Sequence, residues 1–434
     1  MKNWSGSQEY HPKQIAKPDS EEAIVTIVKD ALAKGKVVRP VGSGHSFSPI
    51  CVTEDTLLSL ENYTGIVRVD TTTHEVRVRA GTTLKSLGEL LFNHGLAMEN
   101  LGDIDAQTIA GTISTGTHGT GRNFGIISTQ VTALRFVNGQ GKIINCSLKD
   151  KPELLKAAQV SLGLLGIITE ITIACVPAYK LALQNAKAPL TEVLNTLEDR
   201  KQNNRNFECY WFPHTNTAWT KTSNLADEEA DRNGWLHRVS EHVLENQVYG
   251  LLCEVERQIP ALTKTIARIS AAAAPTVRKV HHSHRVYATE RLVRFNEMEY
   301  NIPAKALPEV IKEVQQTIRV QGFKVHMPIE IRFVARDDIY LSPAHQRDSA
   351  YIAFHVYGRK DYRPYFKAME AICRSVDGRP HWGKLHTLTT EDVQKSYFKL
   401  PDFLEFRAAH DPAGIFLSPY FAKLFGLSTK RLSA

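Results

Sequence analysis

Two glycine-rich stretches in this chain have the composition of loops that hold anions. Residues 39–49 read RPVGSGHSFSP, and residues 111–121 read GTISTGTHGTG. Glycines such as Gly42 and Gly44 allow a turn to expose consecutive backbone N–H groups, and such a nest binds phosphate above all. His45 follows directly, so its imidazole could touch, or bond covalently to, whatever group the phosphates carry.

Neither stretch follows an established phosphate-binding pattern. There is no glycine-lysine-Ser/Thr ending, and no GxGxxG opens a helix after a strand. Two unrelated turns between strands are therefore an alternative for either stretch alone. Because both combine glycines and hydroxyl residues with one histidine, the sequence favours a shared ligand.

Polar side chains on two expected strands could form a substrate surface. Residues 328–335 read PIEIRFVA, and because side chains alternate along a strand, Glu330 and Arg332 share the face opposite the apolar residues. A solvated edge strand with a surface ion pair is the simpler alternative. Residues 351–357, YIAFHVY, repeat the pattern with His355 and Tyr357. If the two strands are neighbours, their polar faces merge into one hydroxyl-binding surface.

A lysine in residues 379–386, RPHWGKLH, is a candidate general base. Most lysines are merely solvated. Lys384, however, follows Trp382 and a flexible glycine. Close to Arg332, its pKa would be lowered by loss of hydration and by like charge, as a general base requires.

The sequence gives no indication of a metal site. His281, His282 and His284 stand in the basic segment RKVHHSHR without a carboxylate at ligand spacing, so we expect a solvated or phosphate-facing loop there. The six cysteines form no CxxC pair, which argues against a zinc site and a disulfide framework and fits a reducing compartment.

Length and composition indicate a soluble protein of two domains. At 434 residues the chain is long for one hydrophobic core. After residue 177 the expected helices become longer and the expected strands richer in charged and aromatic residues. We expect domains at 1–177 and 178–400, with 401–434 packing back near the first. A net charge of +7 is mild and spread out, which suits anionic ligands but not nucleic-acid binding. Without a signal-peptide core or a long apolar run, we expect a cytoplasmic protein with no membrane segment.

The elements of the first domain should place the glycine stretches at strand ends. Residues 19–35 predict an amphipathic helix, with Asp19 and Glu22 as a capping box, and residues 36–41 predict a strand that leads into the first stretch. Helices are also expected at 83–95 and 152–158, and strands at 57–60, 67–69, 76–80, 131–137, 142–145 and 166–176. Residues 96–121 lack an apolar period and predict a long functional loop.

With these motifs in order, the chain resembles the FAD-linked sugar oxidases, which include gulonolactone, arabinonolactone and alditol oxidases. The resemblance covers nearly the whole chain, through VGSGHS, GTISTGTHGTG, GIITE, EIR, HWGK and the closing DPAGIFLSPYFAKLFG. It implies an α+β, two-domain vanillyl-alcohol-oxidase fold, with an FAD-binding domain of the PCMH type and an α+β substrate domain.

The resemblance also implies how the FAD is held. His45 matches the position that is bonded to the 8α-methyl of the flavin ring, which implies a covalent flavin. Gly102 matches a position where family dehydrogenases carry alanine, so glycine implies an oxidase that O2 can reach. The implied cofactor-binding residues are Val41, Gly42, Ser43, Gly44, His45, Ser46, Gly102, Gly111, Thr112, Ser114, Gly116, Thr117, His118, Gly119, Ile167 and Ile168.

The implied reaction oxidises a CH–OH group, with hydride passing to flavin N5 and the electrons then to O2, giving H2O2. Lys384 would accept the hydroxyl proton, while Arg332 and Glu330 grip flanking hydroxyls or a lactone carbonyl. The implied substrate-binding residues are Thr108, His355, Tyr357 and His386.

An aldono-1,4-lactone is the leading substrate class, because EIRFVARDDIYLSP and YIAFHVYG resemble bacterial lactone enzymes. Thr108 matches a small hydroxyl residue of alditol oxidases, so a polyol such as xylitol or sorbitol is the alternative. A flavin-carrying binding protein without turnover is a third hypothesis. Glu330, Arg332 and Lys384 together argue against it, since a carrier needs no base. The sequence predicts no oligomeric state.

Overall fold

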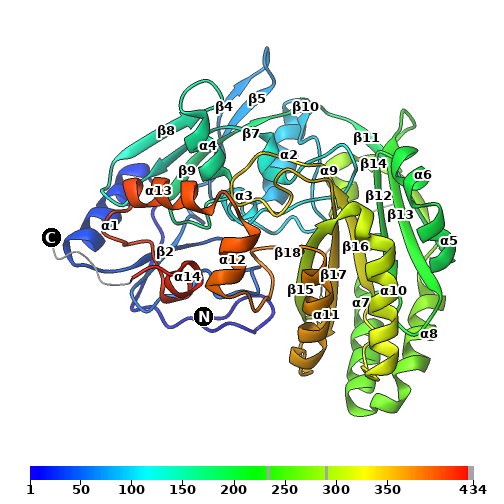
Figure 1. Cartoon of the computed structure of the whole chain (residues 1–434). Helices are drawn as coiled ribbons and strands as arrows, with labels where there is room; N and C mark the ends of the chain where they lie inside the picture. The colour runs from blue at the N-terminus through cyan, green and yellow to red at the C-terminus, as the bar shows by residue number, and fades with distance from the viewer. Residues whose placement is uncertain (232–234, 289–291, 429–434) are drawn as a thin grey trace.

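Two antiparallel sheets organise the chain, which the computed structural model describes over residues 1–231, 235–288 and 292–428. A five-stranded sheet has the order β4-β5-β9-β7-β8, and an eight-stranded sheet has the order β14-β11-β13-β12-β16-β17-β15-β18. Figure 1 shows the first at the upper left and the second at the right. The two sheets use different parts of the chain, before residue 175 and after residue 179.

The first half contains the five-stranded sheet, a small parallel sheet and four helices. The large strands are β4 (Ile66–Asp70), β5 (Glu75–Arg79), β7 (Val131–Val137), β8 (Ile143–Ser147) and β9 (Ile167–Ala174). The parallel sheet is β1 (Gln14–Ala16), β3 (Thr56–Ser59) and β2 (Val38–Val41), and a short pair joins β6 (Leu96–Ala97) to β10 (Val176–Pro177). The helices are α1 (Glu21–Ala33), α2 (Leu84–Asn93), α3 (Ile109–Ser114) and α4 (Pro152–Gln159).

Most elements predicted for this half are confirmed, and two details are wrong. The helix α1 is capped by Ser20, whose hydroxyl accepts a hydrogen bond from the N–H of Ala23, so the predicted cap at Asp19 lies one residue too early. The predicted loop over residues 96–121 contains the helix α3. It forms because the hydroxyl of Thr108 accepts from the N–H of Gly111 (3.2 Å), which satisfies a donor of the first turn.

The second half is the eight-stranded sheet, one face of which is covered by four helices. Its strands are β11 (Lys180–Pro189), β12 (Asn206–Trp211), β13 (Thr217–Leu225), β14 (Arg278–His282), β15 (Phe295–Pro303), β16 (Ile329–Val334), β17 (Ser349–Tyr357) and β18 (Arg379–Pro380). The covering helices are α5 (Leu190–Asn195), α6 (Leu197–Gln202), α10 (Leu307–Val320) and α11 (Arg363–Ser375). As predicted, Ile331 of β16 and Phe354 of β17 belong to the core beneath these helices.

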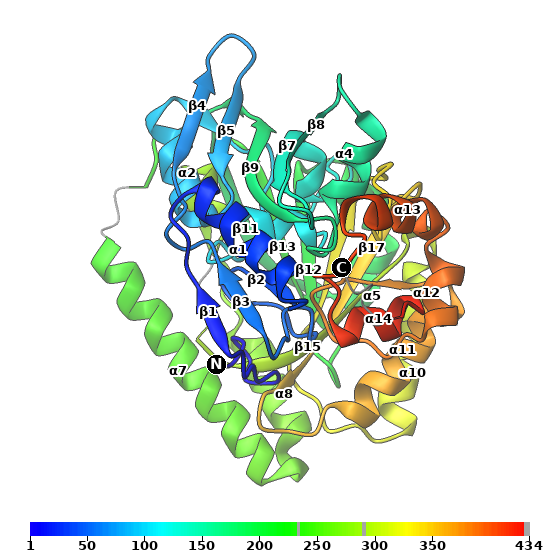
Figure 2. The same ribbon diagram turned by 90° about the vertical axis from the view of Figure 1, so that its left-hand side faces the viewer.

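Three further helices extend beyond this sandwich. The long α7 (Trp235–Gln258) stands at the edge of the molecule in Figure 2, and α8 (Thr263–Ala273) packs on β13. The short α9 (Ser283–Tyr287) lies against α2. Within the described residues, no helix combines the length and the apolar character needed to cross a membrane.

The end of the chain packs on the first half through α12 (Thr390–Ser396), α13 (Leu400–His410) and α14 (Pro419–Phe425). Arg39, which lies in β2 and is almost fully buried, connects these parts. Its guanidinium donates to four backbone carbonyls, those of Ile50, Leu162, Gly163 and Phe416. The buried apolar side chains form two large clusters, of which the second lies within the second half while the first also includes residues after 177 such as Leu181, Tyr351 and Trp382. The domain limits therefore stay a prediction.

Candidate active site

The two glycine stretches line one cavity of about 520 Å³. The first stretch also contacts the segment just before the second: the hydroxyl of Ser43 donates to the carbonyl of Ala106 (2.5 Å), and a Cβ added to Gly42 would overlap the hydroxyl of Thr108. The wall holds ten of the predicted cofactor residues, namely Val41, Gly42, Ser43, Gly44, His45, Ser46, Gly111, Ser114, Ile167 and Ile168.

The other predicted cofactor residues lie outside this wall. Thr112 is fully buried, and the hydroxyl of Thr117 lies 3.4 Å from that of a neighbouring threonine. Gly116 packs close to a proline ring outside the cavity. Gly102 and Gly119 line a much smaller cavity of about 20 Å³ beside the eight-stranded sheet.

The second glycine stretch is attached to the ends of β12 and β16. The hydroxyl of Thr120 donates to the carbonyl of Phe207 (2.5 Å) and accepts from the N–H of Phe333 (3.2 Å). The N–H of Gly121 donates to the carbonyl of Phe333 (2.8 Å), and the side-chain amide of Asn206 donates to the carbonyl of Thr120 (2.6 Å). These bonds bring the second glycine stretch against the face of the sheet opposite to α5, α6, α10 and α11, which we call the open face.

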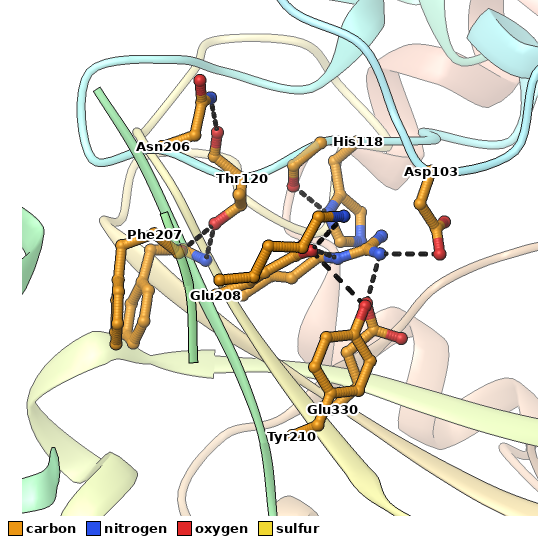
Figure 3. Close-up of polar contacts among 12 residues, drawn as sticks. Asp103, His118, Thr120, Asn206, Phe207, Glu208, Tyr210 and Glu330 are labelled. Carbon is orange, nitrogen blue, oxygen red and sulfur yellow. Dashed lines mark hydrogen bonds and ion pairs between the residues drawn. The ribbon is translucent and has the colours of Figure 1, made fainter. Parts of the chain in front are cut away.

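Arg332 lies on that open face at the centre of a buried group of carboxylates, which we call the arginine cluster. Its Nε is 2.9 Å from Oε2 of Glu208, its Nη2 is 3.1 Å from Oδ2 of Asp103, and it also contacts Glu330. The hydroxyl of Tyr210 donates to Glu330 (2.9 Å). Figure 3 shows Asp103 reaching in from the first half while the other groups rise from the sheet.

The register of the strands explains this cluster. β16 lies between β12 and β17, so it is a central strand and the edge-strand alternative is wrong. Side chains directly opposite on neighbouring strands share a face, which places Glu208 beside Arg332 and Lys221 beside Glu208. Burial alone would raise the pKa of Glu208, but the charges of Lys221 (2.8 Å) and Arg332 hold that pKa below its usual value.

Lys384 lies in a second group, the lysine cluster, with Glu297 of β15 and His355 of β17. Its Nζ is 2.5 Å from Oε2 of Glu297, whose Oε1 is 3.6 Å from Nε2 of His355. The predicted lowering of the lysine's pKa is wrong. Burial does lower the pKa of Lys384, but Glu297 and then Glu299 outweigh it and raise the pKa above its usual value.

The lysine cluster lies at the His45 end of the cavity. The N–H of Phe47, just after the first glycine stretch, donates to the carbonyl of Gly383 (2.6 Å). Burial and the charge of Lys384 lower the pKa of His45 to about 4, so its imidazole is neutral. The charge of Asp103 raises the pKa of Lys384, and the same carboxylate pairs with the arginine cluster. The two clusters are therefore electrostatically joined.

Of the predicted substrate-binding residues, His355 alone belongs to either cluster. Thr108 caps α3 in the wall of the cavity. Tyr357, at the end of β17, lines a separate surface hollow beside α7. Nε2 of His386 is hydrogen-bonded to the hydroxyl of Tyr420 (3.1 Å), and burial lowers its pKa to about 4.

His118 turns from the cavity to the sheet. Its Nε2 is 3.1 Å from Oε1 of Glu299, and its ring stacks on Tyr351 with 3.6 Å between centroids. Among the described residues, no group of three or more His, Cys, Asp and Glu side chains could hold a metal ion. In the HHSH segment, His284 pairs with Glu89 (3.2 Å).

Sequence reasoning missed several charged members of the clusters. Glu297 and Glu299 alternate with apolar residues in FNEMEYNIP, the same signal that identified Glu330. Glu208 follows the same rule in NFECYW. Asp103 has no such signal, because its position depends on how a loop crosses to the other half.

Comparisons with known proteins now identify the family. A family profile described as D-arabinono-1,4-lactone oxidase matches residues 171–424, and the L-gulono-1,4-lactone dehydrogenase of Mycobacterium tuberculosis is 35% identical over 98% of both chains. The chain belongs to the D-arabinono-1,4-lactone oxidase family. A second profile, described as an FAD binding domain, matches residues 12–147 and confirms that the chain contains an FAD-binding domain.

Other members and solved structures agree with this assignment. The L-gulonolactone oxidase of Bos taurus is 32% identical over 98% of both chains. A solvent-stable cholesterol oxidase superposes with a TM-score of 0.82 over 98% of this chain and 97% of its own, at 18% identity. At that identity the likeness shows the fold alone, and it confirms the predicted α+β fold of the vanillyl-alcohol-oxidase type.

The cavity fits an FAD in two respects. Its volume of about 520 Å³ is in the range of cofactor pockets. Within the described residues, Oε1 of Gln107 in its wall is buried without a hydrogen-bond partner, as expected of a group that binds a ligand. The first glycine stretch and α3 would hold the cofactor between them, with His45 at the end next to Lys384.

Proposed function

We propose that this member of the family is an FAD-dependent oxidase acting on the CH–OH group of an aldono-1,4-lactone. The observation that carries the proposal is the lysine cluster at the His45 end of the cavity, joined electrostatically to the arginine cluster through Asp103. The relatives named above are described as acting on gulonolactones, which supports a lactone over a polyol.

The two other hypotheses are less well supported. Thr108, the residue that favoured an alditol, caps α3 in the cofactor cavity and does not join the polar face of the sheet. A flavin carrier without turnover gains nothing from Lys384 and Arg332 buried beside carboxylates, because burying charges costs free energy unless they serve a purpose.

Bound FAD would supply the oxidant that takes a hydride from the carbinol carbon. The forked guanidinium of Arg332 would orient hydroxyl or lactone oxygens, so that one carbon is presented to the flavin. Asp103 and Glu208 would hold this guanidinium in place from two sides.

The raised pKa of Lys384 changes the role that it can play. An ammonium group cannot accept a proton, so Lys384 would donate a hydrogen bond to the carbinol oxygen and stabilise the negative charge that develops there. The proton itself would pass to a carboxylate of the open face. We assign it to Glu330, which belongs to the EIR motif that the resemblance places at the reactive edge.

The neutral imidazole of His45 supports covalent attachment of the flavin, because only a neutral ring has a nitrogen lone pair for a bond to carbon. We also propose that Gly102 leaves O2 access to the flavin. Since all six cysteines are free thiols, we keep a cytoplasmic location as part of the proposal.

The direct test mixes the anaerobic protein with L-gulono-1,4-lactone, D-arabinono-1,4-lactone, xylitol and sorbitol and follows the flavin absorbance. A lactone should bleach the flavin faster than either polyol, and admitting air should then release peroxide. An Arg332→Met variant serves as the control for unspecific reduction. If none of the four compounds bleached the flavin, the proposed activity would be wrong; faster bleaching by a polyol would favour the alditol hypothesis.

A further inference from the structure

Glu297 is a buried carboxylate that no motif indicated, and it forms the shortest contact of Lys384. It is 5% exposed on β15, and its Oε2 is 2.5 Å from Nζ of Lys384. Its backbone carbonyl accepts from the N–H of Leu385 (3.0 Å), so main chain and side chain bind the same segment. The lysine is thereby fixed at both ends.

Two aromatic side chains next to Glu297 also favour the charged form of Lys384. Nζ of Lys384 lies 5.1 Å from the centre of the Phe47 ring, within the range of a cation–π contact. That ring packs against Phe295, which precedes Glu297 on β15 by two residues. The ammonium group is therefore held between an aromatic face and a carboxylate.

His355 completes the arrangement from the neighbouring strand. Its Nδ1 is 2.9 Å from the carbonyl of Pro328, which requires a proton on Nδ1 because a carbonyl only accepts. Its Nε2 faces Oε1 of Glu297 at 3.6 Å. The same carboxylate thus lies between two basic groups, and it cannot rotate away from Lys384 without losing His355.

We propose that Glu297 is a positioning residue that keeps Lys384 as a fixed cation at the reactive end of the site. This inference rests on the proposed function and deepens it, because it assigns the lysine an electrostatic role and excludes it as the base. The titratable and charged groups that face Lys384 are Asp103, Glu297, Glu299, His45 and His381, and His355 faces Glu297 from the other side.

The decisive variant is Glu297→Gln, which keeps the shape of the side chain and removes its charge. Without this carboxylate the pKa of Lys384 should fall, and the cation should be lost within the working pH range. If the cation is what the reaction needs, anaerobic flavin reduction by lactone becomes slower than in the parent, by about tenfold or more at pH 9, and slows further as pH rises. If Lys384 were the base, the same variant would be faster at pH 7.

Two matched variants separate charge from packing. Glu297→Asp keeps the charge and should keep the pH profile of the parent, and Glu309→Gln on the exposed face of α10 should match the parent in rate and profile. A Glu297→Gln protein that is faster than the parent at pH 7, or whose profile equals that of the parent, would overturn the proposal.

A measurement without substrate tests the charge of the lysine directly. The holoenzyme is treated with acetic anhydride between pH 6 and pH 10, and acetylation of Lys384 is read by mass spectrometry, because only the neutral amine reacts. In Glu297→Gln the labelling should begin at least one pH unit lower than in the parent. Identical curves, including an absence of labelling in both, would contradict the proposal. If no lactone reduced the parent flavin, the proposed function would fail while this labelling still decided the role of Glu297.

Discussion

Replacement of Arg332 by methionine should destabilise the protein in a way that depends on pH. The guanidinium lies within ion-pair distance of Asp103, Glu208 and Glu330, and it is 7% exposed. Removal of one partner from a buried ion pair costs about 3–5 kcal/mol, because the remaining charge is left without compensation. Here three carboxylates would face one another, with Lys221 as the nearest remaining cation.

The sign of the pH dependence follows from these carboxylates. In the parent, cations hold the pKa of Glu208 below its usual value, against the effect of burial. In Arg332→Met, burial and mutual repulsion should instead raise the folded-state pKa of the carboxylates above the unfolded value of about 4.3. A raised carboxyl pKa destabilises the fold at neutral pH, and this cost disappears as pH falls through the raised value.

The assay is urea unfolding of parent and variant at pH 7 and pH 5. The difference in unfolding free energy should be about 3–5 kcal/mol at pH 7 and clearly smaller at pH 5. Arg332→Lys keeps a positive charge without the planar fork and should lose less. An equal difference at both pH values would mean that the carboxylates are not the cause, and the electrostatic account of the arginine cluster would be refuted.

Three further predictions concern residues of the first half of the chain. His45→Ala should release its flavin on acid precipitation, whereas the parent pellet stays yellow; a colourless parent pellet would disprove covalent attachment. Gly102→Ala should slow reoxidation by air and spare reduction by lactone, because the new Cβ, 3.1 Å from the carbonyl of His118, would narrow the path that glycine leaves for O2. Equal slowing of both half-reactions would contradict this prediction. Arg39→Met should lower the free energy of unfolding by at least about 3 kcal/mol, since four buried carbonyls lose their donor. Replacement of the exposed Arg68 by methionine is the control. If both variants lost the same free energy of unfolding, the hydrogen bonds of Arg39 would not stabilise the fold.

The sequence predicted the faces of the strands well, because alternation is a local property. Glu330 and Arg332 do lie opposite the buried Ile331, and His355 lies on the same open face of the adjoining strand. The same rule, applied to β15, would also have identified Glu297. The short helix α3 escaped because six residues are too few to display a helical apolar period, and only the hydroxyl of Thr108 marks its start.

The pKa of Lys384 could not be predicted from the neighbouring residues in the sequence. Trp382 and Arg332 suggested a lowered pKa, but the residue that decides it, Glu297, lies 87 positions away along the chain. Strand pairing between β15 and β17 sets Glu297 directly opposite His355, and β18 brings the lysine segment to the same strand. Sequence reasoning did predict that Lys384 is buried, but whether its pKa falls or rises depends on such charged partners.

The balance of charge on the open face bears on the kind of molecule that can bind there. Each of five carboxylates has a basic side chain within ion-pair distance: Asp103 and Glu330 have Arg332, Glu208 has Lys221, Glu297 has Lys384, and Glu299 has His118. A ligand with a carboxylate of its own would compete with these five carboxylates for the same basic side chains, at a large desolvation cost. A neutral ring with hydroxyl groups adds no charge and needs only hydrogen bonds, which the charged side chains of this face can donate and accept. The site is therefore suited to a lactone and unsuited to the open aldonate that hydrolysis of the lactone would give.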